Sequence, residues 1–258
     1  MEVVYKIDNR TEHHNSGITD MNSDKDLSYL YKEIHQCHIC PNMDCEKALR
    51  KIEAVDMKTD VFIVSQSLAE NQLRRTGVNF FADDGSLGST GVNLEKFLNL
   101  FERTVYPPED IVMESGARIE RRNTSHISVY NSEIAQCFPG KRKDGKGDRK
   151  PSAKEIYNCM TQEFLSREIQ ILKPAIVILM GRISRNIFFR FFVGNKMFPN
   201  SLADHIVQIV GKGEMPTCLF GDHRCCILPI QHASGANPSF SKMLLNQKLI
   251  EIIRKELQ

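Results

Sequence analysis

The run Pro174-Ala175-Ile176-Val177-Ile178-Leu179 decides the expected fold of this chain. Its apolar residues follow one another almost without interruption, which is typical of a strand buried on both faces of a sheet. The run comes directly after a predicted helix, which Ser152 and Glu155 open as a capping box and which Pro174 ends. Buried strands that alternate with helices predict a parallel sheet with helices on both of its faces.

The segments on either side continue this alternation of strands and helices. Apolar runs predict further strands at 61–64, 127–134, 206–210 and 226–230, and helical spacing predicts helices at 94–101, 152–171, 183–188 and 244–257. We therefore expect an α/β fold, a three-layer αβα sandwich with a central, mostly parallel sheet. Residues 1–25 are polar and aperiodic, so we expect a disordered arm there and a single domain over 26–258. The long connections 104–126 and 194–224 are expected near the functional site.

Composition narrows the class of protein. The net charge of +2 gives the chain no general affinity for polyanions, so a nucleic-acid contact would need a local basic patch. No apolar run approaches the roughly 20 residues that span a bilayer, and the N-terminus lacks the apolar stretch of a secretory signal. We expect a cytoplasmic, monomeric protein with no membrane partner.

The cysteines suggest a metal site. Eight cysteines in a cytosolic chain are not expected to form a disulfide framework, because that compartment keeps thiols reduced. Cys37 and Cys40 form a polar C-x-x-C, Cys137 follows a predicted strand, and Cys159 lies on the capped helix, so the four can converge. Four thiolates select zinc or an iron–sulfur cluster, and the spacing does not separate the two. Cys45 is a competing ligand.

Six short motifs follow one another in a characteristic order. They are Cys37-His38-Ile39-Cys40, Thr76-Gly77-Val78-Asn79-Phe80, Cys137-Phe138-Pro139-Gly140, Pro151-Ser152-Ala153-Lys154-Glu155-Ile156-Tyr157-Asn158-Cys159, the K-P-x-I-V-x-L-x-G pattern at 173–181, and His232-Ala233-Ser234. Over roughly residues 35 to 250, this set resembles the iron–sulfur uracil-DNA glycosylases, often called families 4 and 5 of that superfamily.

The resemblance implies a DNA glycosylase, which flips a base out of the stack and hydrolyses its N-glycosidic bond to leave an abasic site. It implies a structural [4Fe–4S] cluster on Cys37, Cys40, Cys137 and Cys159, with no other small-molecule cofactor. His232 would support the negative charge on the departing base, and Phe80 would stack on that base. The residues that would contact the DNA backbone are Ser234, Gly235 and Asn237. No lysine matches a Schiff-base nucleophile, so the enzyme is expected to be monofunctional.

The loop 141–150 is longer than the family usually shows at this place. It holds six basic residues against two acidic ones. A charge run is usually only a solvated loop, but beside a DNA site it predicts phosphate contacts, which we assign to Lys141, Arg142 and Lys143.

Two positions depart from the family pattern. Gln66 stands where the family has an acidic residue, which leaves a neutral amide to orient water or substrate. Glu133 stands where uracil-specific members carry an asparagine. An ionised Glu133 offers acceptors only, so it would repel uracil O4 but accept from the exocyclic amine of a cytosine. A protonated Glu133 would restore uracil binding, and Asn131 would take the asparagine role if the strand carried a bulge.

Three functions remain open at this level. The favoured one is excision of a cytosine-type base, which an ionised Glu133 would accept. The base would have to be modified, because removal of plain cytosine would destroy the host genome. A modified cytosine suggests a role in antiviral defence against foreign DNA. The second is uracil excision in base-excision DNA repair. The third is a non-catalytic DNA-binding protein on the same fold. A zinc protein unrelated to base excision is the alternative to the iron–sulfur assignment.

Overall fold

A computed structural model describes residues 27–44, 59–69, 79–107, 109–113, 116–121, 128–194, 201–234 and 238–258. The expected N-terminal arm, 1–25, lies outside these ranges. The central sheet has the strand order β4-β1-β5-β7-β6. Its strands are β1 (Val61–Ser67), β4 (Val129–Ala135), β5 (Ile176–Met180), β6 (Thr217–Phe220) and β7 (His223–Ile230). The first four in this order are parallel, and β6 alone pairs antiparallel, with β7.

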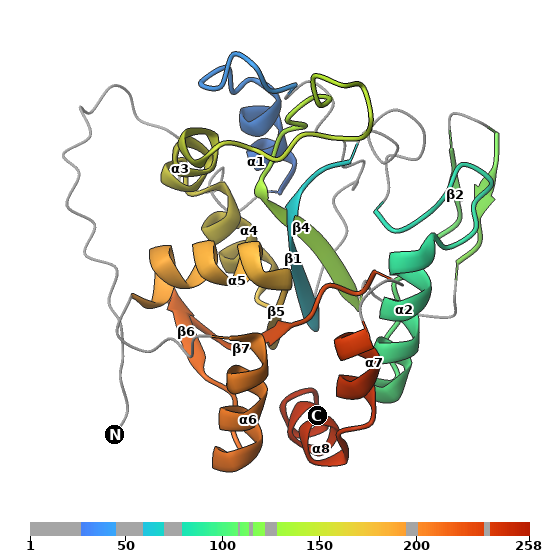
Figure 1. The fold of residues 1–258 in the computed structure, drawn as a ribbon, viewed down its shortest axis with the longest axis vertical. Coiled ribbons are helices and arrows are strands. Elements are labelled where there is room, and N and C mark those ends of the chain that lie inside the picture. Colours follow the sequence, from blue (N-terminus) through green and yellow to red (C-terminus); the bar gives the residue numbers. More distant parts are fainter. Residues whose placement is uncertain are drawn as a thin grey trace.

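Helices cover both faces of the sheet, so the expected three-layer α/β sandwich is confirmed (Figure 1). One face carries α1 (Leu27–His35), α3 (Ala153–Thr161), α4 (Phe164–Leu172), α5 (Gly181–Phe188) and a π-helical turn (Phe189–Val193). The other carries α2 (Ser89–Leu98), a 3-10 turn (Asn99–Phe101), α6 (Leu202–Lys212), α7 (Pro238–Leu244) and α8 (Gln247–Glu256).

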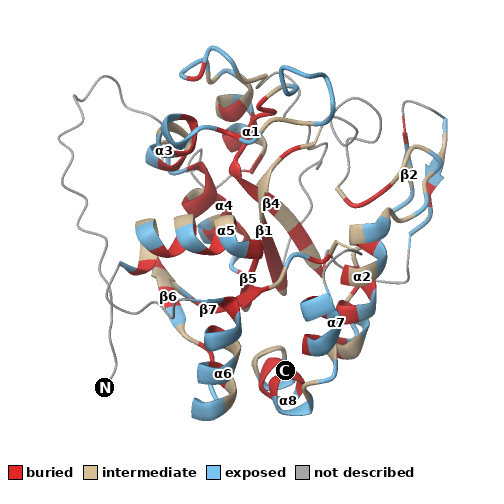
Figure 2. Cartoon of the chain, in the orientation of Figure 1, coloured by how far each residue is buried: buried red, intermediate tan, exposed pale blue. Residues whose placement is uncertain are grey.

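Strand β1 shows why both layers are needed. Phe62 and Val64 pack into one hydrophobic cluster, and Val61 and Ile63 into the other. Side chains of a strand alternate between the two faces, so four consecutive apolar residues require apolar cover on both sides. The buried strands at the centre and the exposed outer helix faces are visible in Figure 2.

The structure differs from the expectation at three single elements. The helix expected over 152–171 is two helices, because Glu163 between α3 and α4 has a left-handed φ of 58°. The strand expected at 206–210 belongs instead to helix α6. Ser201 and Asp204 form a capping box at its start, and Gly213 ends it with a left-handed φ of 74°. A short apolar run does not distinguish a strand from a helix, and here the caps decide.

The long connection 104–126 carries a small antiparallel hairpin of β2 (Ile111–Val112) and β3 (Arg118–Ile119). Met113 and Ile119 pack with Phe81 in a third apolar cluster, so the hairpin supports the loop in front of α2. The expected helix over 244–257 is also interrupted, because Asn246 caps the start of α8 after α7 has ended. None of the helices in the described ranges is long and apolar enough to cross a membrane.

Candidate active site

A cavity of about 610 Å³ lies at the carboxyl ends of the parallel strands. Gln66 lines it from β1, Glu133 from β4, and His232 from the segment just after β7. Parallel strands bring their carboxyl ends to one edge of the sheet, which is where open α/β sheets bind their ligands. The three expected catalytic residues, far apart in the sequence, therefore meet at one cavity.

Glu133 is a buried carboxylate in the wall of this cavity and is 1% exposed. Its Oε1 accepts hydrogen bonds from Asn79 Nδ2 at 3.0 Å and from Asn131 Nδ2 at 2.8 Å. Ser65 Oγ in turn donates to Asn131 Oδ1 at 3.2 Å. Two amide donors satisfy this oxygen and orient the carboxyl group. Asn131 is outside the cavity lining and contacts Glu133, which is in the lining.

Phe80 lines the same cavity and has an unusual backbone. Its φ of 75° lies in the left-handed region, which is strained for a bulky residue. The Gly88 amide donates to Phe80 O at 2.8 Å. Gly91 packs so closely that a Cβ there would lie 2.6 Å from the same oxygen. These contacts hold the strained turn, and the turn brings Phe80 to the cavity, where the expected stacking on a base would occur.

His232 lines the cavity while remaining exposed to solvent. Partial loss of hydration lowers the pKa of its imidazole below the ordinary value, because the charged form is the one that burial penalises. The backbone N–H of Ser234 donates to His232 Nδ1 at 3.2 Å. A neutral ring that accepts at Nδ1 carries its proton on Nε2, so Nε2 is left as an N–H donor.

The residues expected to contact the DNA backbone after His232 are only partly described. Ser234 is placed by its bond to His232, whereas Gly235 and Asn237 lie outside the described residues. The first turn of α2 supplies a feature that sequence analysis missed: Ser89 and Thr90 line the cavity, and the N-cap Gly88 has no side-chain cap. The free N–H groups of a helix N-terminus favour a negatively charged group such as a phosphate.

The basic loop reaches the cavity with its C-terminal end. Lys141 pairs with Asp148 at 3.0 Å and Arg142 with Asp144 at 3.0 Å, so both acidic residues of the loop are used within it. Lys143 is exposed and forms no ion pair with any residue that the structure describes. Exposed pairs of this kind contribute little free energy, so they leave the lysine and arginine side chains accessible to phosphates.

Asp148, Arg149 and Lys150 belong to the lining of the cavity. The DNA contacts expected from the sequence lie at the start of this loop, and no motif indicated Arg149 or Lys150. A run of basic residues in the sequence shows that positive charge is present. Which of these residues faces the cavity depends on the path of the loop, which the sequence pattern does not show.

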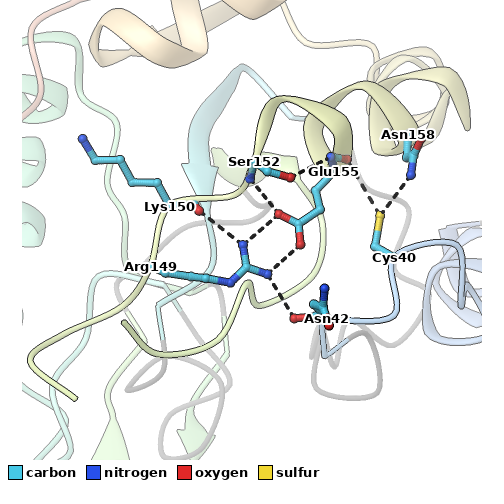
Figure 3. A network of polar contacts seen from close by, with 7 residues as sticks. All are labelled: Cys40, Asn42, Arg149, Lys150, Ser152, Glu155 and Asn158. Atoms are coloured by element: carbon cyan, nitrogen blue, oxygen red, sulfur yellow. Dashed lines mark hydrogen bonds and ion pairs between the residues drawn. The ribbon is translucent and has the colours of Figure 1, made fainter. Parts of the chain in front are cut away.

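The expected cysteine ligands are brought together by backbone and side-chain contacts. Gln136 N donates to Cys159 Sγ at 3.3 Å, which places α3 against the end of β4 next to Cys137. Asp44 and Phe138 form an antiparallel bridge, which places the C-x-x-C loop beside the same strand end. Asn158 Nδ2 donates to Cys40 Sγ at 3.6 Å (Figure 3).

The chemical state of these cysteines differs. Cys37, Cys40 and Cys159 are free thiols, whereas Cys137 is disulfide-bonded. Burial raises the pKa of the Cys159 thiol to about 12, and the nearby Cys37 and Cys40 raise it as well. Within the described ranges, no group of three or more His, Cys, Asp or Glu side chains is arranged to hold a single metal ion. Cys45, the competing ligand, lies outside those ranges.

Comparison with known proteins identifies the family. A sequence model of the Uracil DNA glycosylase superfamily matches residues 52–258. No protein of curated function matches the chain significantly. The matched range contains the whole central sheet and every residue that lines the cavity, and it begins after Cys37 and Cys40. The fold, the cavity at the carboxyl edge of its sheet and the match over most of the sequence agree, and the chain belongs to the uracil DNA glycosylase superfamily, whose members are DNA glycosylases.

Proposed function

We propose that this chain excises a modified cytosine-type base from DNA and leaves an abasic site. The observation that carries the proposal is the state of Glu133: a buried carboxylate in the cavity wall, oriented by two amide donors on one oxygen. An oriented, ionised carboxylate accepts a hydrogen bond from an exocyclic amine and repels a carbonyl oxygen. Cytosine derivatives carry the amine at the position where uracil carries O4.

The other residues of the cavity suit the remaining steps. A flipped base would stack on the Phe80 ring, and the Nε2–H of neutral His232 would donate to the carbonyl O2 of the base. In hydrolysis, the C1′–N1 bond breaks and its electron pair leaves with the base, while a water oxygen bonds to C1′ and the water proton passes to the base. A donor at O2 stabilises the charge that develops on the leaving base. Gln66, with its neutral amide, would orient the water.

The size of the cavity supports a base that carries a substituent. Its volume of about 610 Å³ falls within the range of roughly 300–1,000 Å³ that holds drug-sized ligands, which are larger than one pyrimidine ring. Leu68 and Ala69 form part of the lining, and we propose that the substituent on the base lies against them. A modification that distinguishes foreign from host DNA would occupy this space, which is the basis for proposing a role in antiviral defence.

We further propose that Cys37, Cys40, Cys137 and Cys159 hold a [4Fe–4S] cluster, which would place the chain in the iron–sulfur branch. Two observations support this proposal: soft thiolates are the ligands that such a cluster takes, and N–H groups of Gln136 and Asn158 donate to the sulfurs of Cys159 and Cys40, a contact that stabilises bound thiolates. Cys137 would act as a ligand once its disulfide is reduced. Bound there, the cluster would cross-link the C-x-x-C loop, the end of β4 and helix α3. Iron and sulfide content and a brown colour separate it from zinc.

Base release followed by mass spectrometry tests the proposed activity. Duplex oligonucleotides would each carry a single uracil, cytosine, 5-methylcytosine or 5-hydroxymethylcytosine. We expect release of a modified cytosine, an abasic site and no strand cleavage. Efficient release of uracil by the unmodified protein would establish the repair alternative instead. DNA binding without release of any base, over a wider set of modifications, would favour the non-catalytic alternative.

The variant Glu133→Asn tests the base-reading role directly. It should lower release of the native base by roughly 10- to 100-fold, the effect of losing one charge-assisted hydrogen bond, and raise release of uracil. Glu168→Gln is the matched control. Glu168 is also a buried carboxylate, 0% exposed, and it accepts from Tyr130 Oη at 3.3 Å and Gln136 Nε2 at 3.0 Å. It lies outside the cavity lining, so the control should lower stability without changing the preferred base.

A further inference from the structure

Arg149 makes an unusually complete set of contacts for a residue in a basic loop (Figure 3). Its Nη1 donates to Glu155 Oε2 at 2.8 Å and its Nη2 to Glu155 Oε1 at 2.6 Å, which is the bidentate fork that guanidinium and carboxylate favour. Nη2 also donates to Asn42 O at 3.1 Å and Nη1 to Lys150 O at 3.3 Å. One side chain therefore joins three segments: its own loop, helix α3 and the C-x-x-C loop.

The partners of Arg149 belong to the surroundings of the cysteine site. Glu155 is also the capping-box residue of α3, since Ser152 N donates to Glu155 Oε2 at 2.6 Å. The same helix contacts Cys40 through Asn158, and Asn42 is two residues beyond Cys40. Figure 3 shows these groups on one side of the guanidinium. A displacement of the C-x-x-C loop or of the first turn of α3 would therefore move Arg149.

Arg149 also borders the cavity proposed to take the substrate. Asp148, Arg149 and Lys150 form a consecutive part of its lining. The backbone N–H of Arg149 donates to Gly140 O at 2.9 Å and closes the base of the loop. The Lys150 carbonyl is held by Arg149 itself. This stretch of cavity wall is fixed by its Arg149 contacts to segments that carry cysteines.

We propose that Arg149 is a positioning residue that couples the cysteine site to the substrate cavity. Its bidentate pair with Glu155 holds the wall segment 148–150 in the shape that accepts the DNA. Coupling between two sites is reciprocal, so DNA in the cavity must also stabilise the cysteine-bearing loop. The inference rests on the proposed glycosylase function for the identity of the substrate, but the coupling itself can be measured with bound DNA alone.

The first test is kinetic and uses Arg149→Gln and Arg149→Lys. The glutamine variant removes the charge and the fork, and we expect KM for the DNA substrate to rise about tenfold or more while kcat changes much less. Lysine keeps the charge without the planar fork, so it should restore only part of the loss. Full restoration by lysine, or a fall in kcat at constant KM, would show that fixed geometry of the wall is not what Arg149 provides.

Arg103→Gln is the matched control. Arg103 pairs with Asp60 at 2.7 Å, with side chains 20% and 15% exposed, against 27% and 12% for Arg149 and Glu155. It also donates to backbone carbonyls, at Phe101 and Leu257. Asp60 precedes β1, so this pair lies at the amino end of the strand whose carboxyl end borders the cavity. The control should lose comparable thermal stability and keep the wild-type KM.

The second test measures reciprocity at the cysteine site. The protein as isolated would be treated with iodoacetamide, and mass spectrometry would measure the rate at which Cys40 is labelled. The rate would be compared without DNA and with a saturating duplex that contains an abasic site. We expect DNA to slow labelling several-fold in the wild type and in Arg103→Gln, and to have no effect in Arg149→Gln. Equal protection in Arg149→Gln, or none in the wild type, would overturn the coupling. Absence of base release by a wild type that shows this protection would overturn only the proposed function.

Discussion

Replacing Gly91 with alanine should destabilise the protein, although helix propensity predicts the opposite. Gly91 lies in the first turns of α2, where alanine is ordinarily favoured by up to about 1 kcal/mol. A Cβ at this position would lie 2.6 Å from Phe80 O and 3.0 Å from Phe80 Cβ. The backbone oxygen would have to retreat by about 0.4 Å to reach even the 3.0 Å that real Cβ atoms barely tolerate.

Phe80 has little freedom to retreat. Its oxygen is bonded to the Gly88 amide at 2.8 Å, and its φ of 75° is already strained. Overpacking of a buried contact costs about 1–3 kcal/mol, which exceeds the gain from helix propensity. We expect a net loss of about 1–2 kcal/mol in the free energy of unfolding, which for a chain of this length lowers Tm by roughly 3–6 °C. Displacement of Phe80 should also raise KM for the DNA substrate.

Thermal unfolding and base-release kinetics would measure both effects. Gly211→Ala is the control, because Gly211 lies in α6 and a Cβ there would meet nothing within 4 Å. It should leave Tm unchanged or raise it, and leave KM unchanged. A Gly91→Ala protein that is as stable as the wild type, or as stable as the control, would refute the argument that this glycine is required by the close approach of Phe80.

Three further predictions concern titration and salt. Burial, with a smaller contribution from Arg185, lowers the pKa of His205 to about 4; the residue is 3% exposed. The unfolded state takes up the proton at about pH 6.5, so this histidine should cost up to about 3 kcal/mol of stability as pH falls from 6.5 to 4. His205→Gln should flatten that part of a plot of urea midpoint against pH. The lowered pKa of His232 keeps the ring neutral at neutral pH, so kcat/KM should fall with acid only below pH 6.5. This acidic fall should be absent in His232→Asn, whose residual activity should not depend on pH in that range. Lys143→Gln should reduce the slope of log affinity against log salt by about one for every duplex, and an unchanged slope would remove Lys143 from the phosphate contacts.

Local pattern was enough to predict the layers of this fold. The run at 175–179 became β5, and the alternation around it became a mostly parallel sheet with helices on both faces. Burial on both faces acts on consecutive residues, so it leaves its mark within a few positions of the sequence. The same reasoning failed at 206–210, where the apolar run is compatible with a strand or a helix and the caps at Ser201 and Gly213 decide.

The sequence predicted which residues form the candidate site better than it predicted the contacts between them. Gln66, Phe80, Glu133 and His232 do line one cavity, as the order of motifs suggested. The role of Asn131 was left open by sequence, and its hydrogen bond to Glu133 places it as a support.

By itself, the sequence determined the α/β class, the superfamily to which the motifs belong and the residue types available for base excision. The tertiary structure decided which of those residues face the cavity, how Glu133 is oriented and which end of the basic loop joins the cavity wall. It also revealed the strained turn at Phe80 and the contacts of Arg149, which no motif indicated. The physical reason is the separation along the sequence of the residues that interact. Burial patterns and helix caps depend on neighbouring residues. A site is made by groups such as Asn42, Arg149 and Glu155, which come within hydrogen-bonding distance only when the chain is folded.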